Sequence, residues 1–188
     1  LSYKISKPRL PHYWKSTLMN IGVLGAGSWG LALASVLLDN KHQVTLWHYK
    51  KKNLKSSSGI LFTLDLDDLS NQDIILIALP SHSIKSILNN LKINDKTLIV
   101  NCSKGFDLET GKTLSSTITD QLNIDFNQFI TLSGPTHAEE VINKIPTAIV
   151  AASLSIKNAK IIQEEFSNNY FRVYTSTDLI GVEIGGAC

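Results

Sequence analysis

The chain has 188 residues, of which 43% are hydrophobic and 18% charged, so it can bury one core of ordinary size and is neither disordered nor collagen-like. The formal net charge is +2, but four of the 18 basic residues lie in the first 18 positions and all 16 acidic residues follow them, which leaves residues 19–188 at net −2. This distribution gives no support to nucleic-acid binding, and the longest apolar runs fall far short of the roughly 20 residues that a membrane-spanning helix needs.

Residues 1–18 carry charges and Pro but no continuous apolar stretch, so they lack the pattern of a signal peptide. The only methionine, Met19, stands directly before the first strand-like run. We therefore expect residues 1–18 to be a non-native leader or a disordered arm, with a short ordered arm as the alternative. Residues 19–188 are expected to form the domain.

From residue 20 onward, short apolar runs alternate with amphipathic stretches, a pattern typical of βα units around a mostly parallel sheet. Strands are predicted at residues 20–24, 43–47, 73–79, 97–102, 129–132, 147–152 and 171–174. Helices are predicted at residues 28–38, 84–91, 114–122, 137–143 and 156–166, with one more beginning after Asp178. Residues 50–58 are polar and aperiodic, which predicts a loop. The expected fold is α/β, a Rossmann-like doubly wound sheet with helices on both faces.

A glycine motif, G-x-G-x-x-G at Gly25, Gly27 and Gly30, lies between the first predicted strand and the first predicted helix. In this context the first glycine permits a tight turn, the second lets a pyrophosphate approach the backbone, and the third allows close helix-to-strand packing. The helix N-terminus then offers N–H groups to phosphate. Ser28 either donates to phosphate or caps the helix, and Trp29 either lies against a cofactor or packs in the domain.

The end of the second predicted strand bears on which dinucleotide is bound. NAD-specific sites usually place an Asp or Glu here to accept from the ribose 2′-OH. This chain has Trp47, His48, Tyr49 and three lysines instead. Because cationic groups attract a 2′-phosphate, NADP(H) is favoured over NAD(H), and a solvated loop is the alternative explanation of the lysines.

Other polar residues follow the later strands, at the edge where open α/β sheets bind ligands. Lys104 follows one strand and can hold a substrate hydroxyl or phosphate, although a surface turn would also explain it. His82 and His137 lie at the same edge and are candidates for polar contacts. The two cysteines, Cys102 and Cys188, lack metal-ligand and disulfide spacing, so no metal site is predicted and a reducing cytoplasm fits best.

Seven motifs in order resemble bacterial NAD(P)-dependent glycerol-3-phosphate dehydrogenase. They are GAGSWG (25–30), VTLW (44–47), ALPSH (78–82), SKGFDLETG (103–111), LSGPTHAEEV (132–141), PTAIVAAS (146–153) and FRVYTSTDLIGVEIGGA (171–187). The resemblance implies reversible reduction of dihydroxyacetone phosphate to sn-glycerol 3-phosphate, which supplies phospholipid synthesis in the cytoplasm. A homodimer of the full-length enzyme is one expectation for its oligomeric state.

By motif match, the resemblance implies particular contacts. Ser28 and Trp29 would contact the cofactor phosphates, His48 and Tyr49 would lie at its adenosine end, and Lys104 would touch both cofactor and substrate. The nicotinamide side would be lined by Gly134, Thr136 and Ala138, and the substrate would be bound by Lys104, Gly134 and Thr136.

The sequence also departs from the family pattern. Tyr49 stands where the family usually has Arg or His, and the stretch between Tyr49 and residues 65–69 is much shorter. The chain stops at Cys188, one residue before the lysine regarded as the general acid/base, and the helical substrate domain is absent. We therefore expect a dinucleotide-binding half that is inactive alone. The alternatives are a non-catalytic NADP(H)-binding module and a related dehydrogenase of the hydroxyacid or UDP-sugar type.

Overall fold

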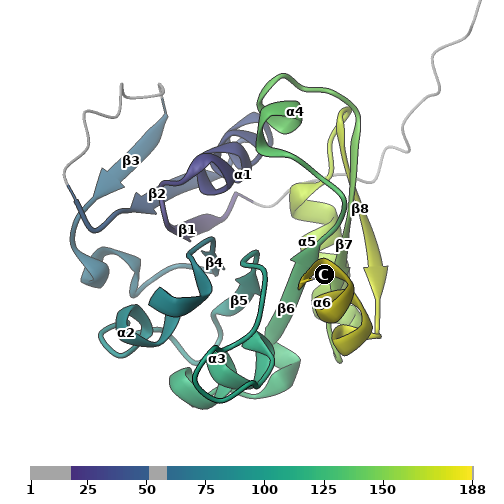
Figure 1. Ribbon diagram of the computed structural model, residues 1–188. Helices are drawn as coiled ribbons and strands as arrows, with labels where there is room; N and C mark the ends of the chain where they lie inside the picture. The colour runs from purple at the N-terminus through teal and green to yellow at the C-terminus, as the bar shows by residue number, and fades with distance from the viewer. Residues whose placement is uncertain (1–17, 51–58, 188) are drawn as a thin grey trace, which may run out of the picture.

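The computed structural model describes residues 18–50 and 59–187. These residues form one eight-stranded sheet in the order β3-β2-β1-β4-β5-β6-β7-β8 (Figure 1). The strands are β1 (Asn20–Leu24), β2 (Gln43–Trp47), β3 (Ile60–Thr63), β4 (Ile74–Ile77), β5 (Leu98–Asn101), β6 (Phe129–Ser133), β7 (Thr147–Ala152) and β8 (Phe171–Ser176). All neighbouring strands are parallel except β6 and β7, which pair antiparallel. The predicted mostly parallel α/β sheet is confirmed.

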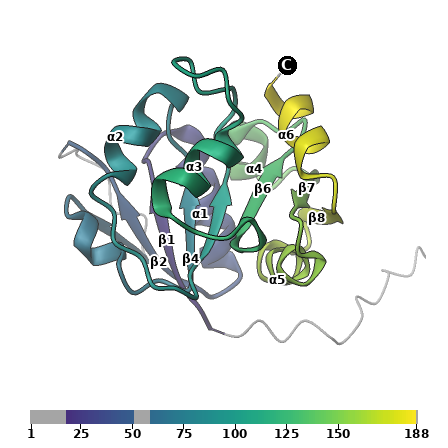
Figure 2. The same cartoon turned by 90° about the horizontal axis from the view of Figure 1, so that it is seen from below.

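Helices cover both faces of this sheet (Figures 1 and 2). One face packs against α1 (Ser28–Asp39), α4 (Ala138–Ile142) and α5 (Ile156–Phe166), and the other against α2 (Ile84–Leu88), α3 (Leu114–Leu122) and α6 (Leu179–Ala187). Three short 3-10 helices add to these elements: η1 (Leu66–Leu69), η2 (Ser81–Ser83) and η3 (Phe126–Gln128). Each face has its own buried apolar cluster, so the doubly wound arrangement follows directly from burial of the sheet on both sides.

Local sequence explains why these elements begin where they do. All four residues of β4 are buried, and they form the continuous apolar run that a central parallel strand requires. Thr113 and Ser155 cap α3 and α5 with side-chain oxygens. Asp178 accepts a hydrogen bond of 2.8 Å from the backbone N–H of Gly181, which confirms that a helix begins after this residue.

Some elements differ from the prediction. Strand β3 was not predicted, because a four-residue strand at the edge of the sheet leaves too short a pattern in the sequence. The helix predicted at residues 84–91 ends at Leu88, ahead of two asparagines. The leader, apart from Leu18, and the loop at 51–58 lie outside the described residues. Within residues 18–50 and 59–187 we find no second, helical domain and no helix long and apolar enough to cross a membrane.

Candidate functional site

The candidate site lies where the strand order changes direction. From β1 the chain passes outward to β2 and β3, then returns to place β4 on the other side of β1. Open α/β sheets bind ligands in the crevice at such a point, outside the carboxyl ends of the strands. The turn after β1 opens directly into α1 at this crevice.

The three motif glycines meet three different conditions in this turn. Gly25 has a φ of +111°, and a Cβ there would overlap the carbonyl oxygen of Ala78. A Cβ on Gly30 would overlap the carbonyl oxygen of Gly25, so the third glycine lets α1 approach the turn. Gly27 is the N-cap of α1 and faces open space, with no side chain capping the helix. Ser28 therefore does not cap α1, and the N-cap residue leaves the first N–H groups of the helix without a side-chain acceptor.

Two cavities adjoin along this helix N-terminus and share Ala78 and Leu79. One, of about 470 Å³, lies at the end of β2. It is lined by Gly25, Ala26, Gly27, Trp47, His48, Tyr49, Ala78, Leu79, Pro80, His82, Ser83, Ser86 and Ile87. This cavity therefore joins the glycine turn and the β2 end, the two segments for which the sequence predicts phosphate and adenosine contacts.

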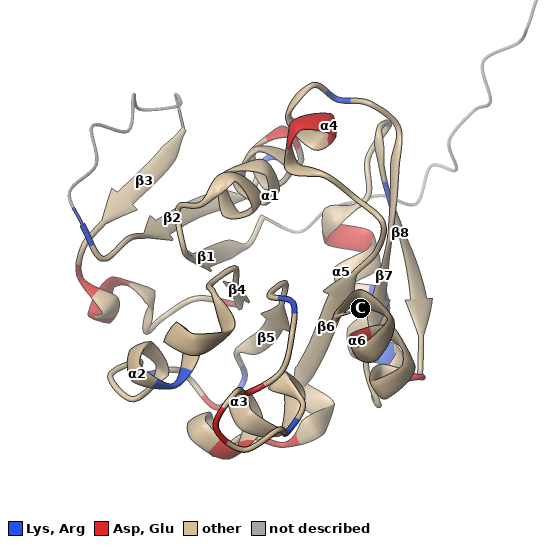
Figure 3. Cartoon of the chain, viewed as in Figure 1, with Lys and Arg blue, Asp and Glu red and all other residues tan. Residues whose placement is uncertain are grey.

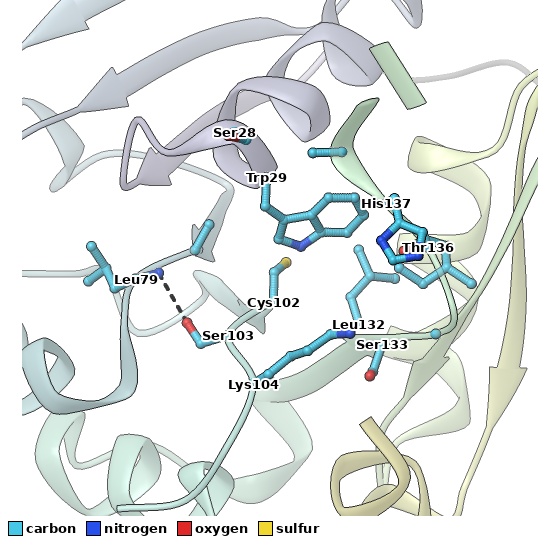
Figure 4. A pocket seen from close by; sticks show the side chains of 14 residues that line it. Ser28, Trp29, Leu79, Cys102, Ser103, Lys104, Leu132, Ser133, Thr136 and His137 are labelled. Atoms are coloured by element: carbon cyan, nitrogen blue, oxygen red, sulfur yellow. Dashed lines mark hydrogen bonds between the residues drawn. The ribbon is translucent and has the colours of Figure 1, made fainter. Parts of the chain in front are cut away.

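The second cavity, of about 330 Å³, lies between the ends of β4, β5 and β6 (Figure 4). Ser28, Trp29 and Lys104 line it together with Gly134, Thr136, His137 and Ala138. In Figure 4 the Lys104 side chain extends across the cavity toward Leu132 and Ser133, and the Trp29 indole lies between α1 and Cys102. Trp29 also packs against the core on the α1 face, as one of the two alternatives expects, and a contact with a cofactor stays a prediction.

Polar contacts hold the strand end that carries Lys104. The Ser103 hydroxyl accepts from the Leu79 N–H at 3.1 Å and donates to the Ile77 carbonyl at 3.2 Å, which ties the end of β5 to the end of β4. Asn101 is fully buried, and its side-chain amide bonds both the N–H and the carbonyl of Ser103. Burial raises the pKa of the neighbouring Cys102 thiol, so this side chain lines the cavity as a neutral group.

At the end of β2, His48 is buried whereas Tyr49 is 65% exposed. Nδ1 of His48 lies 2.8 Å from the Lys50 carbonyl oxygen and 3.1 Å from the Lys50 backbone nitrogen, so the imidazole fixes the backbone at Lys50. The Lys50 ammonium lies 5.1 Å from the centroid of the Tyr49 ring, which places one cation beside the cavity. The other two lysines of the predicted cationic group lie outside the described residues.

The structure thus brings the residues expected from the sequence to one edge of the sheet, in two groups. His82 and His137 are exposed and line different cavities, so they do not form a pair. Sequence reasoning missed Asn101, and it gave no role to Asp107, a buried carboxylate in the loop after Lys104. For Asn101, the sequence offers one indication of a role, namely a polar residue close to the end of a predicted strand. Among the described residues, no three His, Cys, Asp or Glu side chains gather as metal ligands.

Together, the switch-point crevice, the glycine turn and the open N-terminus of α1 define a Rossmann-type α/β domain, a class whose members bind dinucleotides at this edge. Comparison with known proteins identifies the family. Residues 20–57 and 52–159 match the family described as "NAD-dependent glycerol-3-phosphate dehydrogenase N-terminus". The chain belongs to this family.

Relatives and solved structures agree with this assignment. A glycerol-3-phosphate dehydrogenase [NAD(P)+] of Thermoanaerobacter sp. is 41% identical over 90% of this chain and 56% of its own length. The crystal structure of glycerol-3-phosphate dehydrogenase from Coxiella burnetii superposes with a TM-score of 0.81 at 29% identity, covering 90% of this chain and 57% of that one. A UDP-D-ManNAc dehydrogenase from Pyrococcus horikoshii, with 12% identity and a TM-score of 0.61 over 88% of this chain and 49% of its own, shares only the fold. The chain spans a little over half the length of the curated relatives it matches.

Proposed function

We propose that this chain binds a nicotinamide dinucleotide and that the complete protein interconverts dihydroxyacetone phosphate and sn-glycerol 3-phosphate. The observation that supports this most is the pair of adjoining cavities along the N-terminus of α1. Their combined shape suits a two-part ligand with phosphates in the middle, because the glycine turn and α1 run past both. The relatives named above are glycerol-3-phosphate dehydrogenases, which supports the choice of substrates.

In this proposal each group of residues has a distinct task. Gly25, Gly27 and Gly30 allow the backbone N–H groups, Ser28 and the Trp29 edge to meet the phosphates. His48 and Tyr49 lie at the adenosine end, and Gly134, Thr136 and Ala138 line the nicotinamide side. The nicotinamide, when bound, supplies or accepts a hydride. Lys104 holds the substrate beside it, with Gly134 and Thr136 as the opposite wall.

We also propose that NADP(H) is preferred to NAD(H). No carboxylate lies between Trp47 and Lys50, so the usual acceptor for a ribose 2′-OH is missing from the β2 end. The Lys50 ammonium beside Tyr49 supplies positive charge instead. A cytoplasmic location and a homodimer of the complete protein stay predictions from the sequence.

Titrating the chain with NADPH, followed by nicotinamide fluorescence, tests the proposal. We expect saturable binding, with NADH at least about tenfold weaker. Lys104→Met should weaken NADPH binding about 10- to 100-fold, because it removes a charge-assisted hydrogen bond. Lys157→Met, on the exposed side of α5, removes the same charge far from the cavities and should bind as the parent chain does. Absence of saturable binding would contradict the proposal.

The substrate is tested by adding dihydroxyacetone phosphate or sn-glycerol 3-phosphate to the NADPH-saturated chain. We expect either compound to shift the nicotinamide fluorescence, and Lys104→Met to abolish that shift. Glycerol and inorganic sulfate are the controls, because the first lacks the phosphate and the second lacks the carbon skeleton. A shift of the same size with a hydroxyacid would favour the related dehydrogenases instead.

A further inference from the structure

The loop that joins β5 to α3 carries Lys104 near its beginning and a buried carboxylate, Asp107, three residues later. Its other residues are typical of a surface loop: Leu108 is 79% exposed, and Glu109 and Thr110 are exposed as well. Asp107 itself is only 7% exposed. A carboxylate is costly to bury unless it is paired and hydrogen-bonded, so its surroundings show what it holds.

Asp107 is bonded to three parts of the structure. Its side chain accepts from the Lys85 ammonium of α2 at 2.6 Å, from the Thr117 hydroxyl of α3 at 3.2 Å, and from the Thr110 hydroxyl of its own loop at 2.8 Å. The backbone N–H of Glu109 donates to it as well, at 3.1 Å. The hydrogen bond from Lys85 is the main reason why the pKa of Asp107 lies well below its usual range. In Figure 3, a basic segment is coloured on α2 and acidic segments are coloured on the chain leading into α3.

The backbone around Asp107 is closed as well. Its N–H donates to the Lys112 carbonyl at 3.0 Å, its carbonyl accepts from the Gly111 N–H at 2.8 Å, and Phe106 forms a bridge with Thr113. Asp107 thus anchors the loop, and only Gly105 and Phe106 separate it from Lys104. Gly105 has a φ of +103°, a conformation in the left-handed region that makes the turn between the two tight.

On its other side Lys104 follows Ser103, whose hydroxyl is bonded to both Ile77 and Leu79 of the β4 end. The Lys104 backbone thus lies between two anchors, one on β4 and one on α2 and α3. The side chain is exposed and extends across the cavity (Figure 4). A long lysine side chain loses rotamer entropy on binding, so a fixed backbone is the part of its position that the protein can set in advance.

We propose that Asp107 is a positioning residue that acts through Lys104: by joining the β5–α3 loop to α2 and α3, it holds the Lys104 ammonium over the cavity between β4, β5 and β6. This inference rests on the proposed function, in which Lys104 contacts cofactor and substrate. It adds a residue that touches neither ligand. Removing Asp107 therefore weakens only those interactions that Lys104 makes.

A double-mutant cycle on NADPH affinity tests this, with the parent chain, Asp107→Asn, Lys104→Met and the double variant. We expect Asp107→Asn to raise the Kd for NADPH about 3- to 10-fold in the parent chain, because the Lys104 ammonium then keeps only part of its charge-assisted contact with NADPH. In the Lys104→Met chain the same change should leave the Kd unaltered within about twofold, because no ammonium remains to be displaced. Equal weakening in both chains would show a merely structural role and overturn the inference.

The matched control is Glu109→Gln. Glu109 also lies 3.0 Å from the Lys85 ammonium, but its side chain is 81% exposed, so removing this charge should change the Kd by less than about twofold. If Asp107→Asn does not fold, Thr110→Val removes one hydrogen bond from Asp107 at an exposed position and should show the same dependence on Lys104 in weaker form.

If Lys104→Met binds NADPH as the parent does, the Lys104 contact and this inference both fail, whereas dinucleotide binding stands. Loss of binding in every chain contradicts the proposed function itself.

Discussion

At the scale of single residues, Gly27 and Gly30 lie one turn of α1 apart and are needed for different reasons. Gly30 is buried, and a side chain there would overlap the carbonyl oxygen of Gly25 within the protein. Gly27 is exposed, has a φ of −73° that any residue adopts, and faces open space. Gly30 is therefore required by the fold. For Gly27 the fold gives no such reason, whereas the proposed function does, because a phosphate would lie close to its backbone.

This difference predicts opposite outcomes for two alanine substitutions. Gly30→Ala should lower the free energy of unfolding by about 2–4 kcal/mol, because the helix must shift away from the turn. Gly27→Ala should cost at most about 1 kcal/mol, the effect of a poorer N-cap, yet raise the Kd for NADPH more than about tenfold. Urea unfolding and fluorescence titration of both variants check the pair. Unchanged NADPH affinity in Gly27→Ala would place the phosphates elsewhere.

At the scale of elements, α6 is fixed to α3 by one buried acidic side chain. Glu183 is 5% exposed, and its carboxylate accepts from the Ser115 N–H at 2.8 Å and from the Ser115 hydroxyl at 2.6 Å. Ser115 lies in the first turn of α3, where N–H groups lack partners within the helix and a negative charge is favoured. Glu183 therefore supplies an acceptor to the N-terminus of α3, a helix that is distant from it in the sequence.

Replacing Glu183 with alanine should destabilise the protein by about 2–4 kcal/mol, because the buried N–H and hydroxyl of Ser115 lose their acceptor and a cavity is left. Glu183→Gln keeps the shape and one acceptor oxygen, so it should cost about half as much. Chemical denaturation measures both. Ile184→Ala, at a 41% exposed position of the same helix, is the control for a change that removes apolar surface without removing the hydrogen bonds.

How far the sequence predicts these elements depends on the length of the pattern. The run at β4 and the Ala- and Leu-rich stretch of α1 are long enough to define their type, and the glycine motif between β1 and α1 locates the crevice. Strand β3 is not predicted, because its four residues are too few to form a recognisable pattern and they lie close to an aperiodic segment of the sequence. The bond between Glu183 and Ser115 joins residues 68 positions apart, and no local pattern predicts such a contact. The burial of Asp107 is not predicted either, because its main partner, Lys85, belongs to a different helix.

At the scale of the whole molecule, His42 connects the beginning of the described chain with α5. The imidazole Nδ1 accepts from the Met19 N–H at 3.4 Å, and Nε2 lies 3.1 Å from the Glu165 carbonyl oxygen of α5. A carboxyl oxygen of Glu165 also lies 3.2 Å from Nε2. Burial nevertheless lowers the pKa of His42, and the hydrogen bond to the Glu165 carbonyl opposes this only in part.

The lowered pKa sets the direction of a pH effect. Below about pH 6.5 the unfolded chain binds a proton at His42 before the folded chain does, so the free energy of unfolding should fall as the pH decreases from there toward the folded pKa. Above pH 6.5 this contribution is complete. Urea unfolding at pH 7.5, 6.5 and 5.5 should show a steeper loss for the parent chain than for His42→Asn, in which the other histidines are unchanged. Parallel losses in the two proteins would contradict the prediction.

The single antiparallel pairing of the described sheet has a consequence for the walls of the site. Because β7 runs against β6 and β8 follows β7, the helix after β8 runs back toward the carboxyl edge of the parallel strands (Figure 2). Gly186, near the end of α6, packs so closely against Ser133 that a Cβ there would overlap the serine hydroxyl. The carboxyl edge that carries the N-terminus of α1 therefore also carries the residues of α6 around Gly186. Because Ser133 also lines the smaller cavity, α6 supports one wall of that cavity through this contact, although α6 follows the cavity's other lining elements in the sequence.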